Sequence, residues 1–85
     1  MVITLTEPAE KQFKRLPAII KEKVKRQFTK LLENPHHPSL HIKKMKNVDF
    51  YEGRISIHYR FRFLWRGNHI TIISIGQHDV GLGKK

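Results

Sequence analysis

The chain has 85 residues, no cysteine and a formal net charge of +10, so the expected partner is a polyanion or an acidic protein. This length fits one domain with one core, and the lack of cysteine excludes disulfides and zinc–thiolate sites. No apolar run reaches the ~18 residues that span a membrane, and no signal-peptide pattern opens the chain, so we expect a cytoplasmic protein without a membrane partner.

The first half of the chain carries the signals of a short strand followed by two helices. Residues 2–5 are a β-type run, Thr6 is the predicted N-cap, and Pro8 is tolerated in the first helical turn. Pro17 separates the two helices, and Asn34-Pro35 ends the second one. Apolar residues recur at helical spacing in both, which predicts an antiparallel hairpin with one stripe toward the core. The stripe comprises Ala9, Phe13 and Leu16, then Ile20, Val24, Phe28 and Leu31, with Ile19 and Leu32 widening it.

The second half of the chain is patterned for strands. Residues 40–45 are β-compatible, and residues 50–65 are long enough for two strands with a turn near residues 57 and 58. Gly67-Asn68 is a two-residue hairpin signal, and the isoleucine-rich run 70–75 predicts a central strand buried on both faces. The expected fold is α+β: an N-terminal strand and a two-helix antiparallel hairpin packed on one face of a mainly antiparallel four- to five-stranded sheet. We expect residues 1–85 to form a single domain, with 81–85 as a loose tail.

Arginines alternate with large apolar residues along the segment 54–66. Period-two alternation places one set on a buried sheet face and the other set on the opposite face. A sheet surface that repeats guanidinium groups in so basic a chain favours nucleic acid as the ligand. His78-Asp79 follows, and a histidine can move protons, so the combination indicates chemistry on nucleic acid. The even positions are Arg54, Ser56, His58, Arg60, Arg62, Leu64 and Arg66, and the odd positions are Ile55, Ile57, Tyr59, Phe61, Phe63 and Trp65.

Five short motifs follow the helical segments in order: Glu33-Asn34-Pro35, the basic strand 42–46, Tyr51-x-x-Arg54, Tyr59-Arg60 and Gly76-x-His78-Asp79. With this layout, essentially the whole chain resembles the RelE/ParE superfamily, the toxins of type II toxin–antitoxin systems. The resemblance implies a compact five-element toxin fold and a cognate acidic antitoxin as partner. The toxin would contact DNA only indirectly, through this antitoxin. On the RelE branch it implies cleavage of mRNA in the ribosomal A site, whereas the ParE branch poisons DNA gyrase.

Candidate site residues come from the chemistry of RNA cleavage and from the resemblance. Metal-free cleavage needs a base for the 2′-hydroxyl group, stabilisation of charge on the phosphorane, and an acid for the 5′-oxygen. Arg54 and Arg60 are assigned to the phosphate, because the planar guanidinium can hold two phosphate oxygens. The resemblance assigns the acid to His78, and Glu52 and Lys46 are the candidate bases. The expected RNA-binding residues are Lys43, Lys44, Arg62 and Asp79, with no metal and no other cofactor.

Three classes of function stay open from the sequence. The first is a ribosome-dependent mRNA endonuclease that inhibits translation and is neutralised by its antitoxin, and the second is a ParE-like gyrase inhibitor. The third is a weak or inactive RNA-binding relative, because RelE-like toxins often carry a C-terminal tyrosine where this chain has Leu82. His78 together with Arg54 and Arg60 favours the first class, since a gyrase inhibitor needs no general acid. No metal site is expected in the proline-flanked loop of His36, His37 and His41, which lacks cysteine and paired carboxylates.

Overall fold

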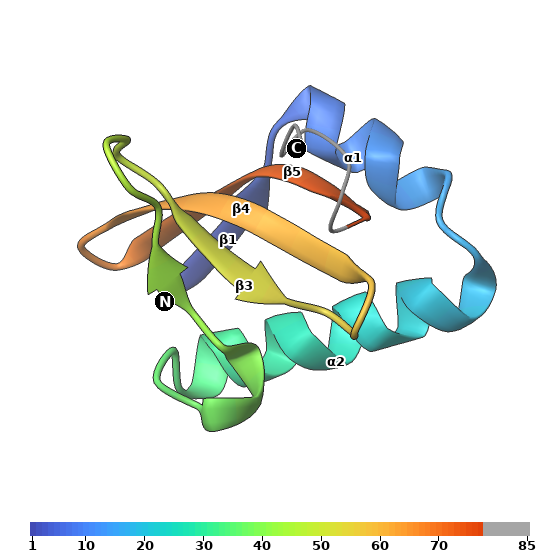
Figure 1. The fold of residues 1–85 in the computed structure, drawn as a ribbon, viewed down its shortest axis with the longest axis horizontal. Coiled ribbons are helices and arrows are strands. Elements are labelled where there is room, and N and C mark those ends of the chain that lie inside the picture. Colours follow the sequence, from blue (N-terminus) through green and yellow to red (C-terminus); the bar gives the residue numbers. More distant parts are fainter. Residues whose placement is uncertain (78–85) are drawn as a thin grey trace.

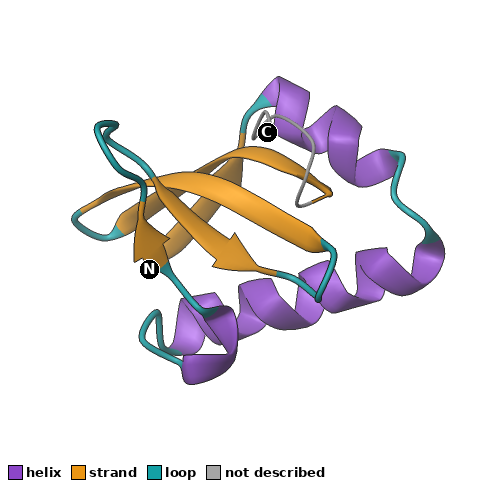
Figure 2. Cartoon of the chain, viewed as in Figure 1, coloured by secondary structure: helices purple, strands orange, loops and turns teal. Residues whose placement is uncertain are grey.

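Two helices and a five-stranded sheet make up the fold of residues 1–77, the part of the chain that the computed structural model describes (Figure 1). The elements are β1 (Val2–Leu5), α1 (Glu7–Lys14), α2 (Ala18–Glu33), the 3-10 helix η1 (Pro38–Leu40), β2 (Lys43–Lys44), β3 (Tyr51–Arg54), β4 (Tyr59–Arg66) and β5 (His69–Gln77). The sheet order is β1-β5-β4-β3-β2, in which β1 runs parallel to β5 and all other neighbours are antiparallel. The expected α+β fold is confirmed (Figure 2). No helix within residues 1–77 is long and apolar enough to cross a membrane.

The ends of the helices largely match the capping signals of the sequence. Thr6 is the N-cap of α1, and its hydroxyl accepts a hydrogen bond from the Ala9 backbone N–H at 3.3 Å. Pro17 is the N-cap of α2, where a residue without an N–H costs no helical hydrogen bond. Asn34 caps the other end of α2, and its backbone N–H donates to the carbonyl of Lys30 at 2.7 Å. The predicted signals therefore mark the start of α1 and both ends of α2, whereas α1 already ends at Lys14, with Arg15 as its C-cap.

The core lies between α2 and one face of the sheet. α2 contributes Val24, which is almost fully buried, and Phe28, whose ring meets that of Phe61 on β4 edge-on with the centroids 5.1 Å apart. The predicted stripe is confirmed for these helix residues, but Ile19 and Leu32 are exposed by 67% and 45%. One residue step turns a side chain by about 100° around the helix, so the neighbours of stripe residues face solvent.

A close contact between a glycine and a phenylalanine shapes the hairpin of β3 and β4. Gly53 faces Phe61 across the two strands, and a Cβ atom on Gly53 would lie 2.4 Å from the Phe61 ring. Only glycine leaves room for this ring, which is fully buried. The strands are joined by residues 55–58, where a turn was expected. The second expected hairpin is also present, and its Gly67 has a φ of 56°, which suits the first position of a two-residue turn.

The two faces of β5 differ, which corrects the prediction that this strand is buried on both. Its core-facing side chains are almost fully buried, whereas Ser74 and Gly76 lie half-buried on the opposite face. The pairing with β4 shifts by one residue beside Arg62 and Phe63, as in a β-bulge. The bulge keeps the unevenly spaced isoleucines on one face, so the apolar run does not require two buried faces. The core-facing isoleucines are Ile70, Ile72 and Ile75.

The segment before β3 is less regular than the sequence predicts. Of the expected strand 40–45, only Lys43–Lys44 pairs with β3. Leu40 ends η1 instead and is fully buried, and His41 follows it with a left-handed φ of 47°. An extended strand cannot include a left-handed residue, so the strand starts only after this turn. β2 is therefore a short edge strand.

α1 covers the part of β5 that β1 leaves without a partner. β1 pairs with β5 only as far as Ile72. Beyond this point, the side-chain oxygen of Gln12 in α1 accepts a hydrogen bond from the backbone N–H of Ile75 at 2.8 Å. Figure 1 shows α1 beside the end of β5, with α2 running along the sheet. The helices thus cover one face and one edge of the sheet, and the opposite face of β3 and β4 carries polar side chains.

Candidate nucleic-acid interface

Charged side chains of three neighbouring strands share the sheet face opposite α2. Directly paired residues of antiparallel strands point to the same face. Arg54 pairs with Arg60, Glu52 with Arg62, and Lys43 with Glu52. The alternation predicted from the sequence is therefore confirmed for these positions. We call the surface formed by Lys43, Glu52, Arg54, Arg60 and Arg62 the arginine face.

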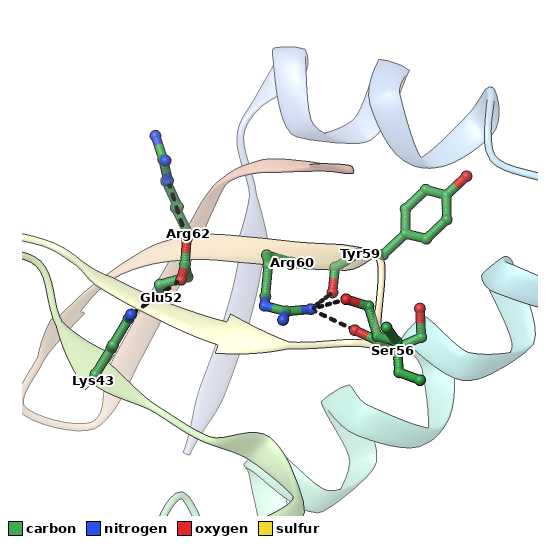
Figure 3. A network of polar contacts seen from close by, with 7 residues as sticks. Lys43, Glu52, Ser56, Tyr59, Arg60 and Arg62 are labelled. Carbon is green, nitrogen blue, oxygen red and sulfur yellow. Dashed lines mark hydrogen bonds and ion pairs between the residues drawn. The ribbon is translucent and has the colours of Figure 1, made fainter. Parts of the chain in front are cut away.

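Glu52 is a buried carboxylate, 5% exposed, at the centre of the arginine face. Its oxygens lie 3.9 Å from Nζ of Lys43 and 3.7 Å from Nε of Arg62 (Figure 3). A buried carboxylate needs such partners, because burial without them penalises the charge. The three residues belong to β2, β3 and β4, so the two ion pairs connect three strands. Glu52 thus has a structural role besides its candidacy as a base.

Arg60 is anchored to the turn between β3 and β4. Its Nη1 donates hydrogen bonds to the carbonyl oxygens of Ser56, Ile57 and Tyr59, the last two at 3.0 Å (Figure 3). Burial, and next the neighbouring Arg54 guanidinium, lower the pKa of Arg60 from its ordinary value. An arginine nevertheless stays charged at neutral pH. The turn therefore holds a permanent positive charge in a fixed position.

One side-chain donor of Arg54 has no partner within residues 1–77. This donor is Nε, which is buried. A buried donor without a partner is costly, so the group needs a physical reason such as strain, a catalytic role, an ordered water or an ion. The backbone of Arg54 is well held, because its carbonyl oxygen accepts a hydrogen bond from the Gln27 side chain of α2 at 2.8 Å.

A pocket of about 390 Å³ opens beside the two arginines. Its cations surround one carboxylate, and an anion bound between the two guanidinium groups would relieve their repulsion. Each charge-assisted hydrogen bond to such an anion contributes ~1.5–3 kcal/mol. The arrangement therefore suits a phosphodiester group. Within residues 1–77, no three His, Asp or Glu side chains are grouped so that they could hold a metal ion. The pocket is lined by His41, Ile42, Lys43, Glu52, Arg54 and Arg60.

Of the three lysines predicted for this site, Lys43 lines the pocket, whereas Lys44 and Lys46 lie away from it. Lys44 pairs with Tyr51, so strand alternation turns it away from the arginine face. Its Nζ donates a hydrogen bond to the carbonyl oxygen of Val48 at 2.8 Å. Lys46 is exposed in the loop after β2 and does not line the pocket. The structure therefore does not bring Lys44 or Lys46 together with the arginines.

Two further predicted residues, His78 and Asp79, lie outside the described part of the chain. The last described residue of β5 is Gln77, which pairs with Tyr59, the residue before Arg60. The roles assigned to His78 and Asp79 stay predictions.

The structure adds two residues that sequence patterns did not assign to this site. Gln27 is 7% exposed and donates through Nε2 to the carbonyl oxygens of Arg54 and Ser39. Its position three residues after Val24 puts a polar group on the apolar helix face, which is a signal visible in the sequence. His41 lines the pocket through the left-handed turn after η1, and no periodic pattern indicates such a placement.

Solved toxin structures share this fold. The YoeB/ParE toxin from Agrobacterium tumefaciens superimposes with a TM-score of 0.77 at 18% identity, covering 92% of this chain and 99% of that chain. A chain of the RelB-RelE antitoxin-toxin complex from Methanococcus jannaschii gives a TM-score of 0.75 at 19% identity, covering 89% and 91%. YafQ from E. coli gives 0.77 at 13% identity, covering 95% and 97%. The chain thus has the fold of these RelE-type toxins.

Sequence comparison assigns the family. The sequence model of the family described as the ParE toxin of the type II toxin-antitoxin system, parDE, matches residues 3–80. The chain therefore belongs to the ParE toxin family of type II toxin–antitoxin systems, within the RelE/ParE superfamily that its motifs resemble. Among curated proteins, none matches the chain by sequence.

Proposed function

We propose that the chain is a RelE-like toxin that cleaves mRNA in the ribosomal A site and is neutralised by an acidic antitoxin. The observation that carries the proposal is the pairing of Arg54 with Arg60 across β3 and β4 in one pocket. Two positioned guanidinium groups suit a phosphodiester whose negative charge increases during cleavage. Structures of a RelB-RelE antitoxin-toxin complex and of the E. coli RelBE toxin-antitoxin complex share the fold, which supports an antitoxin partner here.

The proposed reaction is a metal-independent transesterification within the RNA. The 2′-oxygen loses its proton to a base and attacks phosphorus, and the bond from phosphorus to the 5′-oxygen breaks. The products are a 2′,3′-cyclic phosphate and a 5′-hydroxyl group. Arg54 and Arg60 stabilise the phosphorane, and His78 protonates the leaving 5′-oxygen. An acid or base in such a position contributes ~10²–10⁴-fold in rate.

The other candidate residues differ in whether they line the pocket. Of the two bases considered from the sequence, Glu52 lines the pocket and Lys46 does not. Lys43 and Arg62 extend the positive surface on either side of Glu52, and we assign them to the RNA backbone. The same surface would attract an acidic antitoxin segment, whose affinity should fall as salt screens the charges.

The family match favours a second candidate function, which is inhibition of DNA gyrase. The matching family is described as ParE toxins, and the match spans residues 3–80. The ParE branch of the superfamily acts on gyrase, so in this alternative the arginine face would contact a protein. Neither a general acid nor a pair of phosphate-binding arginines would then be required.

Induction of the chain in growing cells separates the two functions. We expect growth arrest, halted translation and mRNAs cut within coding sequence, as seen by primer extension. Arg54→Ala should abolish the cuts, whereas Arg26→Ala should keep them, because it removes the same charge from an exposed position of α2. Intact mRNA together with blocked plasmid supercoiling would assign the chain to gyrase inhibition instead.

A further inference from the structure

We infer that His41 is the general base that takes the proton from the 2′-hydroxyl group of the RNA, an inference that rests on the proposed mRNA cleavage. His41 lines the same pocket as Arg54 and Arg60. Histidine is the side chain that most often serves as a general base, because a neutral imidazole nitrogen accepts a proton. The pocket thus combines a proton acceptor with two groups that bind phosphate.

The backbone holds His41 at the pocket in an unusual conformation. Its φ is 47°, and its N–H donates a hydrogen bond to the carbonyl of Pro38 at 3.1 Å. Left-handed backbone is uncommon outside glycine, and residues held in it cluster at functional sites. The neighbours fix the turn, since Leu40 is fully buried and Ile42 packs against the core. The side chain of His41 itself is exposed, so RNA can reach the imidazole.

Gln27 connects the segment that carries His41 to the strand that carries Arg54. Its amide nitrogen donates to the carbonyl oxygens of Ser39 at 3.2 Å and Arg54 at 2.8 Å. These two bonds use both donors of the side-chain amide. Ser39 lies two residues before His41, so the amide fixes η1 against the end of β3. Gln27 is therefore a positioning residue that sets the spacing between the base and the phosphate-binding group.

The other candidate bases are less suited to this role. Both oxygens of Glu52 are engaged by cations, at 3.9 Å from Lys43 and 3.7 Å from Arg62, and the residue is 5% exposed. Lys46 lies outside the pocket. The charged groups that share the pocket with His41 are Lys43 from β2, Glu52 and Arg54 from β3, and Arg60 from β4.

The proton balance of the step is complete without a metal or an oxidant. The proton of the 2′-hydroxyl group moves to an imidazole nitrogen of His41 as the 2′-oxygen bonds to phosphorus. The bond to the 5′-oxygen breaks, and the leaving oxygen takes a proton from the acid, which is His78 in the proposed function. The protonated His41 then gives its proton to water, and the acid takes a proton back from water, so both groups return to their starting states.

Single-turnover cleavage on programmed ribosomes tests this role, with ribosome binding and melting temperature measured separately. His41→Asn is the main variant, because asparagine tolerates left-handed backbone but offers no base. We expect cleavage to fall by ~10²-fold with little change in ribosome binding. The wild-type rate should fall toward acid pH as the base becomes protonated, and this acid limb should disappear in the variant. His36→Asn is the matched control, since His36 is an exposed histidine that does not line the pocket.

Chemical rescue separates a catalytic His41 from a structural one. In His41→Gly, the missing ring leaves room for imidazole added to the buffer, which should restore part of the cleavage. Gln27→Met should lower the rate but keep the acid limb, because the base is still present.

Equal rates and equal acid limbs in wild type and His41→Asn would overturn the role of His41 alone. A slow His41→Asn that keeps the acid limb, with no rescue of His41→Gly, would likewise overturn it. A wild type that cuts no mRNA would overturn the proposed function and this inference together.

Discussion

The two faces of β4 are built in different ways. Phe61 and Phe63 are fully buried, and the Phe61 ring packs over Gly53 and against Phe28 of α2. Arg60 and Arg62 alternate with the two phenylalanines along the strand. Arg60 donates hydrogen bonds to the turn that precedes β4, and Arg62 forms an ion pair with Glu52 of β3. The core face depends on close packing, whereas the arginine face depends on charge placed beside a pocket. Substitutions on the first face should therefore reduce stability, and those on the second should reduce activity.

The largest effect is expected from Phe61→Ala on the core face. Removing a fully buried phenylalanine costs ~3–5 kcal/mol in unfolding free energy, through lost burial and the cavity left behind. Such a loss is a large part of the total stability of a small domain. Urea unfolding followed by circular dichroism measures it. A loss below ~1 kcal/mol would mean that the core does not depend on this ring.

Arg54→Ala is expected to show the opposite behaviour. Its buried Nε has no partner within residues 1–77, so its loss should leave the melting temperature nearly unchanged. Cleavage should nevertheless fall by ~10²–10³-fold, as when a preorganised donor to a transition-state anion is removed. Arg60→Ala is the informative comparison, because it also removes the hydrogen bonds to the β3–β4 turn and should lower stability as well. If Arg54→Ala lost activity only because its melting temperature fell, the division between a core face for stability and an arginine face for activity would be wrong.

Gly53→Ala tests the contact that shapes the β3–β4 hairpin. The new Cβ would lie 2.4 Å from the Phe61 ring, so the ring or the strand must move. Overpacking of this kind costs ~1–3 kcal/mol. Gly76→Ala is a suitable control, because a Cβ there meets no atom within 4 Å among the described residues. Equal melting temperatures for the two variants would show that the ring can give way.

The smallest effect is expected for single lysines of β2, and it should depend on the face. Lys43 lies on the arginine face and Lys44 on the other face. Lys43→Gln should weaken binding of 2′-O-methyl RNA, which cannot be cleaved. The slope of log binding constant against log salt concentration should fall in magnitude by ~0.7, because one phosphate contact is lost. Lys44→Gln should leave the slope unchanged. Equal slopes for the two variants would place the RNA elsewhere.

Regular features of the fold could be predicted because each has a local cause. Thr6 begins α1 through a side-chain capping bond, Asn34 ends α2, and period-two alternation assigned Arg54 and Arg60 to one face. The bulge in β5 could not be predicted, since it depends on how that strand pairs with β4. The exposure of Ile19, by contrast, follows from the helical period of about 100° per residue and has a local cause.

The site was only partly predictable, because it combines segments far apart in the sequence. Alternation identified the arginines, but Gln27 reaches Arg54 only through the packing of α2 on the sheet. His41 enters the pocket by a left-handed turn that no repeating pattern encodes. The burial of Glu52 between two cations follows from the pairing of three strands. Tertiary contacts, rather than local sequence, therefore decide which polar residues meet.

The most direct test of the RNA-cleaving role uses purified protein in two parallel assays. One contains programmed ribosomes with a defined mRNA, and the other contains DNA gyrase with relaxed plasmid. Wild-type protein is expected to cut the mRNA within coding sequence and to leave supercoiling unaffected, and Arg54→Ala should lose the cuts. Intact mRNA with inhibited supercoiling, equally in wild type and Arg54→Ala, would contradict the assignment of the arginine face to RNA cleavage.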